Sequence, residues 1–408
     1  MDGSVDYVQN RACGHSGAWS LLMGERGNRL NRFLDRWAGI PLTVCTAGLR
    51  AAAGTARLNM PAEPQRVGFL CLGAIGDLLL LSSLITALRR RLPHARFYLL
   101  TTSGNAATAS LIPGIDESAS FSVRKVPAML DWLRRKKLDM LFDSSQWPRL
   151  GAVLSNLSGA PCTVGFDTPG QCRACGYSHR VPHCADRHEV ENFLALGKAV
   201  YDDLEGEPCL ALPVEAPADA VRADHMLTEL AGACLPRVYL HMWPSGIHAR
   251  LKEWPSGHWA ALARELAGRG FQVCLTGAQG DAARNAAFLV AHADCPAVSL
   301  AGDLSLAGLA WMFSRSAGAV SVNTGTMHLA ALAGAPTVGL HGPTNPLRWG
   351  PWGRKVQSLL PHSGACAYLN LGFEYPQPPV TCMENLPVSD VLDALARMGV
   401  CGPALAAD

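Results

Sequence analysis

The stretch CLGAIGDLLLLSSLITALRR, residues 71–90, decides how the chain around it folds, because two glycines and an acid interrupt an apolar run. The whole apolar run, residues 67–88, is long enough to span a bilayer. A carboxylate at its centre, Asp77, is costly in a membrane, and Gly73 and Gly76 break the run. The stretch therefore predicts a buried strand, a tight turn and a buried helix, with Asp77 at the turn.

Outward from this stretch, segments typical of strands and helices alternate along the chain. The first half begins at Arg66 and contains RVGFLCL, ARFYLLT, LDMLFD and CTVGF as strands, with helices between them. The pattern restarts at PRVYLHM and ends at APTVGLHG, which we expect to be the final strand. Such repetition indicates parallel sheets with helices on both faces. We predict an α/β fold of two Rossmann-like, doubly wound domains facing a central cleft, with ligands at the carboxyl ends of the strands.

Length and composition set the predicted domain boundaries. A chain of 408 residues fits two domains of ordinary size. Residues 1–64 are expected to form an N-terminal helical extension and linker, and residues 65–212 the first domain. A proline-bearing stretch leads into the second domain, residues 213–386, and residues 387–408 form a C-terminal helix and tail.

The bulk composition excludes several classes of protein. Hydrophobic residues make up 49% and charged residues 17%, which is typical of a globular chain. The net charge of +2 leaves no basic footprint, so we expect no nucleic-acid partner. The 14 cysteines are scattered through a long chain that shows no signal peptide. We therefore expect a cytoplasmic protein whose thiols are mostly free and buried.

The extension contains RLNRFLDRWAGIPLTVCTAGLRAAAG, residues 29–54, in which apolar residues recur at roughly helical spacing. Arg29, Arg32 and Arg36 are interleaved with them. A basic amphipathic helix of this kind can lie on an anionic membrane surface. A helix packed against the body of the protein is the other interpretation, and the pattern does not decide between the two.

The aspartate of the opening stretch also has two interpretations. A dinucleotide fingerprint needs a third glycine, and a carboxylate at this turn would repel a pyrophosphate. Asp77 can cap the helix by accepting N–H groups of its first turn. A strand-end loop can also present Asp77 to the cleft as a general base. From this stretch alone, the cap is the more common role.

A second informative stretch covers residues 321–351. A strand runs into NTGT, residues 323–326, and a helix begins at once. Free N–H groups at a helix start, with hydroxyls and a glycine beside them, form a phosphate site. His328 lies one turn into the helix, and the loop of residues 342–344 follows the next strand. Turn chemistry and a satisfied core histidine explain each feature singly, but two such loops on neighbouring strands favour a nucleotide site.

Together these motifs resemble glycosyltransferase family 9, the heptosyltransferases of bacterial lipopolysaccharide synthesis. The family has G-x-x-G-D after a strand, which residues 73–77 match. It also has D-[ST]-G-x-x-H-x-x-A followed by G-P-T-x-P, which residues 324–328 and 342–346 resemble. The stretches LKEWPSGHWAALARELAGRG, SLAGDLSLAGLAWMF and CMENLPVSDVLDAL are similar to further family segments. The ordered set covers residues 66–398, and its order is more specific than any one motif.

The resemblance implies a GT-B fold and transfer of a sugar from a nucleotide donor to a hydroxyl, with inversion and without a required metal or cofactor. Such a transfer needs a base for the acceptor proton and positive groups for the departing diphosphate. Asp77 matches the family's base. Gly76 and Arg149 fall on the acceptor side, and for Arg149 a solvated surface position is the alternative. The residues that match the family's donor site are Lys252, Asp281, Asn323, Thr324, Gly325, His328, Gly342 and Thr344.

The same resemblance implies the partners. ADP-heptose is the family's best-known donor, and the acceptor is a lipid-linked or other saccharide. A monomer is expected, with peripheral association at the inner face of the inner membrane as one option. Two residues depart from the family pattern, because Asn323 replaces an aspartate and Asp281 a glutamate. The phosphate turn with Ser245 and Gly246 is longer or rearranged.

A cluster outside these motifs, CRACGYSHRVPHCADRH, covers residues 172–188. Its C-x-x-C and histidines are compatible with a zinc site, but no second C-x-x-C follows at finger spacing. We expect a cysteine-rich loop without metal. Two other functions stay open at this point. One is a nucleotide-sugar epimerase, which expects more acids around the sugar; the other is a non-catalytic nucleotide-sugar-binding protein, which the asparagine at position 323 motivates.

Overall fold

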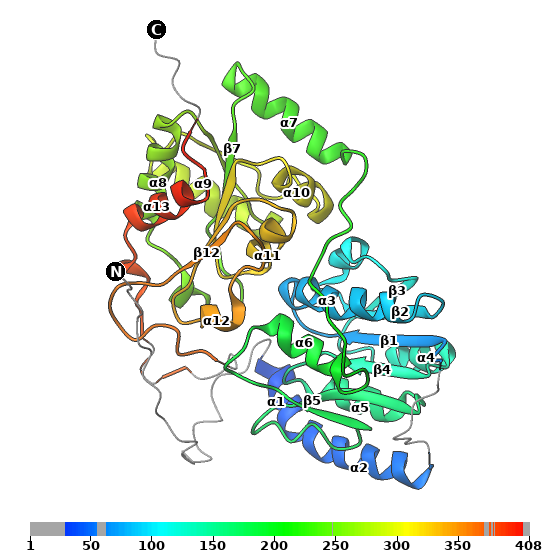
Figure 1. Ribbon diagram of the computed structural model, residues 1–408. Coiled ribbons are helices and arrows are strands. Elements are labelled where there is room, and N and C mark those ends of the chain that lie inside the picture. Colours follow the sequence, from blue (N-terminus) through cyan, green and yellow to red (C-terminus); the bar gives the residue numbers. More distant parts are fainter. Residues whose placement is uncertain are drawn as a thin grey trace, which may run out of the picture.

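The computed structural model describes residues 29–54, 63–246, 248–370, 375, 376, 378 and 380–402. Its strands form two six-stranded sheets, which lie in separate halves of the molecule (Figure 1). The first sheet has the order β3-β2-β1-β4-β5-β6, and all of its pairings are parallel. Its strands are β1 (Arg66–Cys71), β2 (Arg96–Thr102), β3 (Glu117–Phe121), β4 (Met140–Asp143), β5 (Cys162–Asp167) and β6 (His179–Pro182).

The second sheet repeats this winding, with the order β12-β11-β10-β7-β8-β9 and parallel pairings throughout. Its strands are β7 (Arg237–His241), β8 (Gln272–Leu275), β9 (Ala297–Ser299), β10 (Gly318–Val322), β11 (Thr337–Leu340) and β12 (Val356–Leu359). In each sheet the strand order reverses between the first and fourth strands, β1 and β4 or β7 and β10. Doubly wound sheets bind ligands at this reversal point. The predicted fold class is confirmed.

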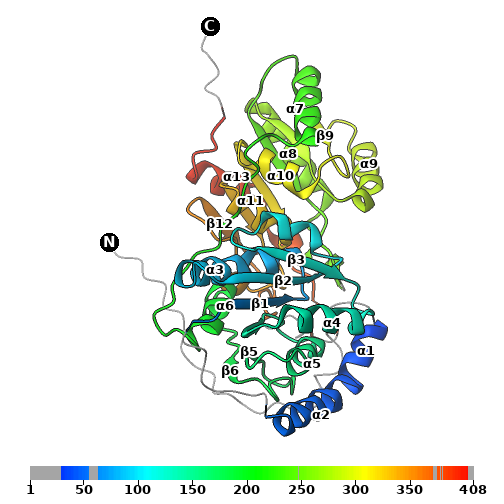
Figure 2. The same ribbon diagram turned by 90° about the vertical axis from the view of Figure 1, so that its right-hand side faces the viewer.

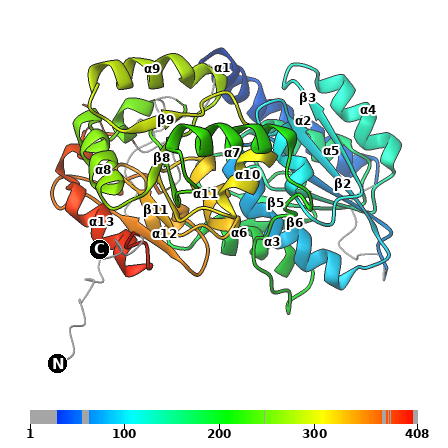
Figure 3. The same ribbon diagram turned by 90° about the horizontal axis from the view of Figure 1, so that it is seen from above.

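Helices connect the strands and cover both sheets (Figure 3). In the first half they are α3 (Ile75–Arg91), α4 (Val126–Lys136), α5 (Arg149–Leu157) and α6 (Glu189–Lys198). In the second half they are α7 (Ala218–Ala231), α8 (Ser256–Gly268), α9 (Ala282–Ala291), α10 (Leu306–Phe313), α11 (Gly325–Leu332), α12 (Pro346–Trp349) and α13 (Val388–Arg397). Short 3-10 turns are η2 (Ala106–Leu111), η3 (Ala249–Lys252), η4 (Gln279–Asp281) and η5 (Met383–Asn385).

The apolar run that opened the sequence analysis forms β1 and α3, as predicted, and both are largely buried. None of the helices in the described part of the chain is both long and apolar enough to cross a membrane. Helix α3 packs against α11 of the other half. One hydrophobic cluster includes Leu84 and Leu88 of α3 together with Leu329 and Ala330 of α11. Apolar contact therefore holds the two halves together.

Several expectations about elements were wrong. APTVGLHG is not the last strand, because β12 follows it and pairs with β11. Strands β3 and β6 were not predicted; they lie at the two edges of the first sheet and alternate in burial. Helix α7 begins within the stretch that was expected only to separate the halves. These elements have weak apolar patterns because one side of each faces solvent.

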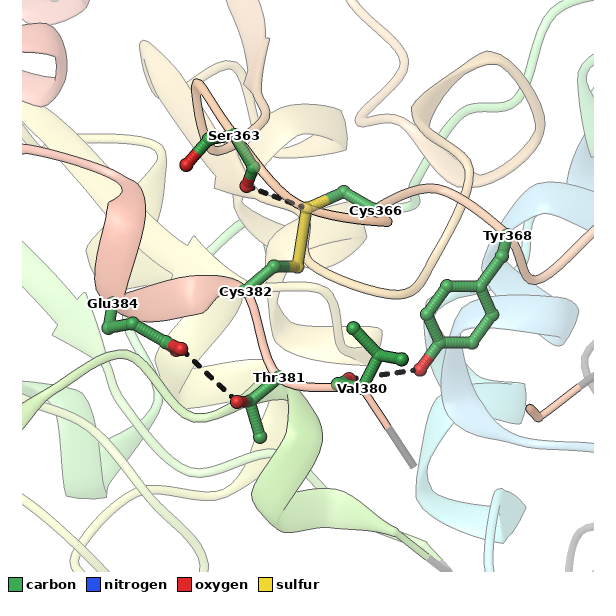
Figure 4. The surroundings of a disulfide bond; sticks show 7 residues. All are labelled: Ser363, Cys366, Tyr368, Val380, Thr381, Cys382 and Glu384. Carbon is green, nitrogen blue, oxygen red and sulfur yellow. Dashed lines mark hydrogen bonds between the residues drawn. A yellow bond between two sulfur atoms is a disulfide. The ribbon is translucent and has the colours of Figure 1, made fainter. Parts of the chain in front are cut away.

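The expectation of mostly free thiols is confirmed for the described cysteines, but the expectation that they are mostly buried was wrong. Cys366 and Cys382 form a disulfide, with Cα atoms 6.3 Å apart (Figure 4). Of the free cysteines described, only Cys71, Cys162, Cys274 and Cys295 are buried. The segment beside the disulfide packs on the loop after β11, where the backbone N–H of Ala367 donates to the carbonyl of Gly342 at 2.8 Å. The fold brings these cysteines together, and their spacing in the sequence does not reveal it.

The N-terminal extension forms helices α1 (Arg29–Trp37) and α2 (Gly39–Ala52) at the outer edge of the first half (Figure 2). Helix α2 packs on α5. Arg50 donates to the carbonyl oxygens of Ala160 and Pro161 at 2.8 and 2.9 Å. Nδ2 of Asn156 donates to Oγ1 of Thr46 at 3.1 Å. The interpretation of a helix packed against the body of the protein is confirmed for α2.

Candidate functional site

The starts of helices α3 and α11 meet at the boundary between the two halves. A Cβ atom placed on Gly76 would lie 3.0 Å from Cδ2 of His328. A Cβ atom placed on Gly325 would lie 2.9 Å from Cβ of Ile75. Glycine at both positions lets the backbones come this close. Since α3 follows β1 and α11 follows β10, both stretches that carry the predicted chemistry lie at the reversal points of their sheets.

Asp77 is half-buried in the first turn of α3 and uses both carboxylate oxygens. Oδ2 accepts the backbone N–H of Ala74 at 2.8 Å, so the predicted capping contact is present. Oδ1 accepts Nε2 of Gln146 at 3.3 Å. Gln146 follows β4, the strand on the other side of the reversal point. The carboxylate is therefore held from two directions, and a cap and a base are compatible roles for it.

The first turn of α11 is suited to an anion. Thr324 is the N-cap residue, and among the described contacts its side chain makes no capping bond to the helix. Its Oγ1 lies 3.4 Å from Oγ of Ser321. N–H groups at the start of a helix that lack a side-chain cap bind phosphate oxygens well. The structure thus brings Thr324 and Gly325 close to the start of α3, which carries Asp77.

His328 lies one turn into α11 and is buried. Burial, and to a smaller degree the nearby rings of His188 and His341, lowers its pKa to about 3. Its Nδ1 has no hydrogen-bond partner among the described residues. The imidazole is therefore neutral near pH 7. It can exchange a hydrogen bond with a ligand, but it does not supply a positive charge to a diphosphate.

Asn323 precedes this turn and is buried. Its Nδ2 donates to the carbonyl oxygen of Trp349 at 2.8 Å, which ties the loop after β10 to α12. An aspartate, the family's usual residue, has no N–H and cannot make this bond. The asparagine at position 323 therefore makes a hydrogen bond in this chain that the family's usual aspartate could not make.

Gly342 and Thr344 are buried in the loop after β11. A Cβ atom on Gly342 would lie 2.7 Å from Sδ of Met383. Oγ1 of Thr344 lies 3.3 Å from Nδ1 of His341. Burial also lowers the pKa of His341 to about 3. Gly342 and Thr344 therefore contact other residues of the second half. His341, like His328, is neutral near pH 7.

Lys252 and Asp281 follow β7 and β8, on the donor half. Lys252 ends η3, and its Nζ donates to the carbonyl oxygen of Ser245 at 3.2 Å. The predicted lysine and the predicted phosphate turn are therefore in contact. Asp281 ends η4, and its Oδ2 accepts the N–H of Ala278 at 2.9 Å. This contact has the same spacing as the one between Asp77 and Ala74.

Arg149 begins α5, and only 2% of its side chain is exposed. Nη1 donates to Oδ2 of Asp35 in α1 at 2.9 Å, and Nε donates to the carbonyl oxygen of Gln171 at 2.9 Å. The alternative of a solvated surface arginine is wrong. The acceptor-binding role of Arg149 stays a prediction, and in the structure its guanidinium fastens α1 to the first half.

A buried ion pair crosses the boundary between the halves. Nε of Arg348 in α12 donates to Oε2 of Glu189 in α6 at 2.8 Å, and neither side chain is exposed. Nε2 of Gln146 donates to Oε1 of Glu189 at 2.5 Å. Burial alone would raise the pKa of Glu189, but the charge of Arg348 and the hydrogen bonds it receives hold that pKa well below its usual range. Contacts therefore run from Asp77 through Gln146 and Glu189 to Arg348.

Histidines of the 172–188 segment complete this boundary. Nη2 of Arg348 lies 2.7 Å from Nε2 of His183, whose pKa is lowered by burial, so the neutral ring accepts this bond. Nε2 of His188 donates to the carbonyl oxygen of Gly350 at 3.0 Å. In the described part of the chain, no three histidine, cysteine or acidic side chains gather closely enough to hold a metal ion.

The same segment supplies a buried charge to the end of β4. Nη2 of Arg173 donates to Oδ2 of Asp143 at 2.5 Å, and both side chains are unexposed. The hydroxyl of Tyr177 donates to the same oxygen at 2.6 Å. In the segment predicted as a cysteine-rich loop, the arginine, the tyrosine and the histidines thus make the contacts with the rest of the protein.

Four residues of this region were not predicted. Glu189 and Arg348 link the two halves, Gln146 joins Asp77 to Glu189 within the first half, and His341 contacts Thr344 within the second. Gln146 could have been found from its place after a predicted strand. Glu189 and Arg348 lie 159 positions apart, and the sequence has no signal that pairs them.

Comparison with known proteins assigns the family. Residues 128–369, more than half of the chain, match the family described as Glycosyltransferase family 9 (heptosyltransferase). The chain belongs to glycosyltransferase family 9. Lipopolysaccharide heptosyltransferase 1 of Pseudomonas aeruginosa is 26% identical over 311 residues, which cover 72% of this chain and 83% of that protein. The matched family residues include the donor-side stretches but not Asp77.

Solved structures agree on the fold of this family 9 glycosyltransferase. Escherichia coli ADP-heptose lipopolysaccharide heptosyltransferase II aligns with a TM-score of 0.63 and 21% identity over 82% of this chain and 98% of that chain. E. coli heptosyltransferase WaaC with ADP-2-deoxy-2-fluoro heptose gives 0.61 and 18% identity over 81% and 99%. The predicted GT-B fold is thereby confirmed. The family match and the heptosyltransferase relatives confirm the predicted enzyme class, a glycosyltransferase, over the epimerase and binding-protein alternatives.

Proposed function

We propose that this glycosyltransferase moves a heptose, with inversion, from ADP-heptose to a hydroxyl of a lipopolysaccharide-core or related acceptor. Its relatives named lipopolysaccharide heptosyltransferases support the sugar and the acceptor, and the similar structure solved with ADP-2-deoxy-2-fluoro heptose supports the nucleotide. The observation that carries the proposal is the meeting of two helix starts from opposite halves, one with Asp77 and the other with the stretch 324–328.

Asp77 is the base in this proposal. As the acceptor oxygen attacks the anomeric carbon, its proton passes to the carboxylate of Asp77. The new carbon–oxygen bond forms on the face opposite the bond to the diphosphate, so the configuration inverts. The N–H of Ala74 and the amide of Gln146 orient the carboxylate without neutralising it.

The donor half receives the leaving group. The bond between the anomeric carbon and the diphosphate oxygen breaks, and its electron pair leaves with ADP. N–H groups at the start of α11 and the ammonium of Lys252 stabilise the charge that develops there. Thr324, Gly325 and His328 contact the diphosphate, and His328 does so as a neutral ring. Asp281 takes the ribose hydroxyls.

The remaining expectations belong to the same proposal. The reaction needs no metal or further cofactor, and Gly76 and Arg149 lie on the acceptor side. A lipid-linked acceptor places the enzyme at the cytoplasmic face of the inner membrane, and the monomeric state stays a prediction.

The test is Asp77→Asn, which keeps an oxygen for the N–H of Ala74 and removes the base. We expect transfer of heptose from ADP-heptose to a lipopolysaccharide-core acceptor to fall by about 10²–10⁴-fold. Calorimetric binding of ADP should be unchanged. Asp281→Asn is the matched control, because its carboxylate caps a turn in the same way. It should raise the donor KM about tenfold with little effect on kcat.

Two results would contradict the proposal. Transfer that survives Asp77→Asn would remove Asp77 from the chemistry. Failure of the wild-type chain to bind ADP would overturn the donor site.

A further inference from the structure

Helix α1 is packed the wrong way round for a helix of a water-soluble protein. Its apolar residues recur at positions 30, 33, 34 and 37, which form one stripe along the helix. Such a stripe normally faces the core. Here Phe33, Leu34 and Trp37 are 58%, 51% and 64% exposed. The polar Asp35 faces inward instead, where it accepts the backbone N–H of Arg149 at 2.8 Å.

Helix α2 shows the same inversion. Its buried residues are Gly39, Thr43, Thr46 and Arg50, which form a small and polar stripe against α5. Its large apolar residues, Leu42, Val44 and Leu49, are exposed. Thr43 and Thr46 donate their hydroxyls to carbonyl oxygens one turn earlier in the helix, so the inward face satisfies its own polar groups.

The exposed apolar surface of the two helices is made of Phe33, Leu34, Trp37, Leu42, Val44 and Leu49. These are half of the exposed large hydrophobic residues in the described part of the chain. The other exposed residues of this kind are spread over later segments, from Leu212 to Leu347. A concentration of this kind marks an interaction site.

The sequences of these two helices carry mostly positive charge. Helix α1 carries three arginines and a single acid, Asp35. That acid is paired with Arg149. The sequences of α2 and α5 contain no acid at all. An apolar face with tryptophan and phenylalanine, on helices with a basic sequence, fits the boundary between anionic headgroups and acyl chains.

We infer that α1 and α2 are a docking surface for an anionic lipid membrane. Neither helix is long enough to cross it, so each lies in the plane of the interface with its exposed apolar side chains toward the lipid. Contact with the membrane stabilises both helices, because lipid replaces the water around their exposed apolar side chains. A second copy of this chain would bring two such basic helices together, which disfavours self-association.

The docking surface is fastened next to the site. Nη1 of Arg149 holds Asp35 of α1 at 2.9 Å, and Arg149 lies three positions after Gln146, which contacts Asp77. The membrane would therefore lie beside the first half, where the proposed acceptor enters. The docking itself does not depend on the transfer reaction, so it can be tested without donor or acceptor.

The test is co-sedimentation of the full chain with vesicles of phosphatidylcholine that contain about one quarter phosphatidylglycerol, against pure phosphatidylcholine. We expect binding to the anionic vesicles that weakens as salt is raised from about 0.1 to 0.5 M. The triple variant Phe33→Ser/Leu34→Ser/Trp37→Ser should bind at least about tenfold more weakly. The variant Leu42→Ser/Val44→Ser/Leu49→Ser should show a similar loss.

A matched control uses exposed apolar residues of the second half, Val221→Ser/Leu230→Ser/Val290→Ser, and should bind like the wild type. All variants change exposed side chains, and equal melting temperatures will show that they fold. Equal binding to neutral and anionic vesicles, or full binding by both triple variants, would overturn the inference. Loss of a dimer in the α1 variant, with vesicle binding retained, would assign the surface to a second copy instead.

Discussion

Arg348 of the second half and Glu189 of the first half are joined by a hydrogen-bonded ion pair of 2.8 Å that no solvent reaches. Glu189 also accepts Nε2 of Gln146, and the same amide nitrogen contacts Asp77. Gln146 therefore contacts both the ion pair that joins the two halves and the proposed base, Asp77. Stability and activity should respond together when this chain of contacts is cut.

Removing the arginine should destabilise the protein strongly. Arg348→Met leaves the carboxylate of Glu189 buried and unpaired, which costs about 3–5 kcal/mol of unfolding free energy. The double variant Glu189→Gln/Arg348→Met removes both charges and should recover most of this loss. Urea unfolding of the wild type and both variants measures the difference. Equal stability of Arg348→Met and the wild type would show that the pair is not coupled to folding.

Gln146 should act on Asp77 as a positioning residue. Gln146→Leu keeps the size of the side chain and removes its N–H donor, so we expect kcat to fall about tenfold with an unchanged donor KM. The acidic limb of the kcat profile should move to higher pH, because the charged carboxylate loses a hydrogen bond. If Gln146 has a purely structural role, Gln146→Leu will lower the stability of the protein and leave the acidic limb of the kcat profile unchanged.

Glycine at position 325 should be required for the two helix starts to meet. Gly325→Ala adds a Cβ 2.9 Å from Cβ of Ile75 and 3.1 Å from the backbone nitrogen of Gly76. Overpacking of this kind costs about 1–3 kcal/mol. It should also lower kcat/KM at least tenfold by separating Asp77 from α11. Gly257→Ala, in a helix with open space at that position, is the control and should leave both quantities unchanged.

The buried histidines should make the protein sensitive to mild acid. Burial lowers the pKa values of His328 and His341 from the ordinary 6.5 to about 3. The unfolded chain therefore takes up protons first, and the stabilisation, complete above pH 6.5, is lost as the pH falls toward 3. Each histidine contributes up to about 1.4 kcal/mol per pH unit. His328→Gln/His341→Gln should flatten unfolding free energy against pH between 6.5 and 5, and an unchanged slope would contradict the assignment.

Much of the fold could be predicted because it rests on local patterns. The continuous apolar strands and the glycine-bounded turns of residues 66–90 and 318–346 are properties of neighbouring residues, and β1, α3, β10 and α11 lie where those patterns placed them. Edge elements such as β3 could not be placed as surely, because a half-exposed strand has no continuous apolar run.

The candidate site was predicted in part for the same reason. Asp77 and Thr324–His328 stand in short motifs, so the sequence could single them out. That they face one another is a tertiary fact, which depends on the close approach of Gly76 and Gly325. The burial of Arg149 against Asp35 was equally invisible, since these residues are 114 positions apart.

By itself, the sequence determined the doubly wound α/β class, the family resemblance and the positions of the two motif-bearing turns, because hydrophobic period and glycine placement are encoded locally. The tertiary structure alone decided that Glu189 pairs with Arg348, that Gln146 reaches Asp77 and that α1 and α2 turn their apolar stripes outward. The reason is physical. Which side of a helix is buried, and which charge meets which, depends on the surfaces that folding brings together across more than a hundred residues of chain.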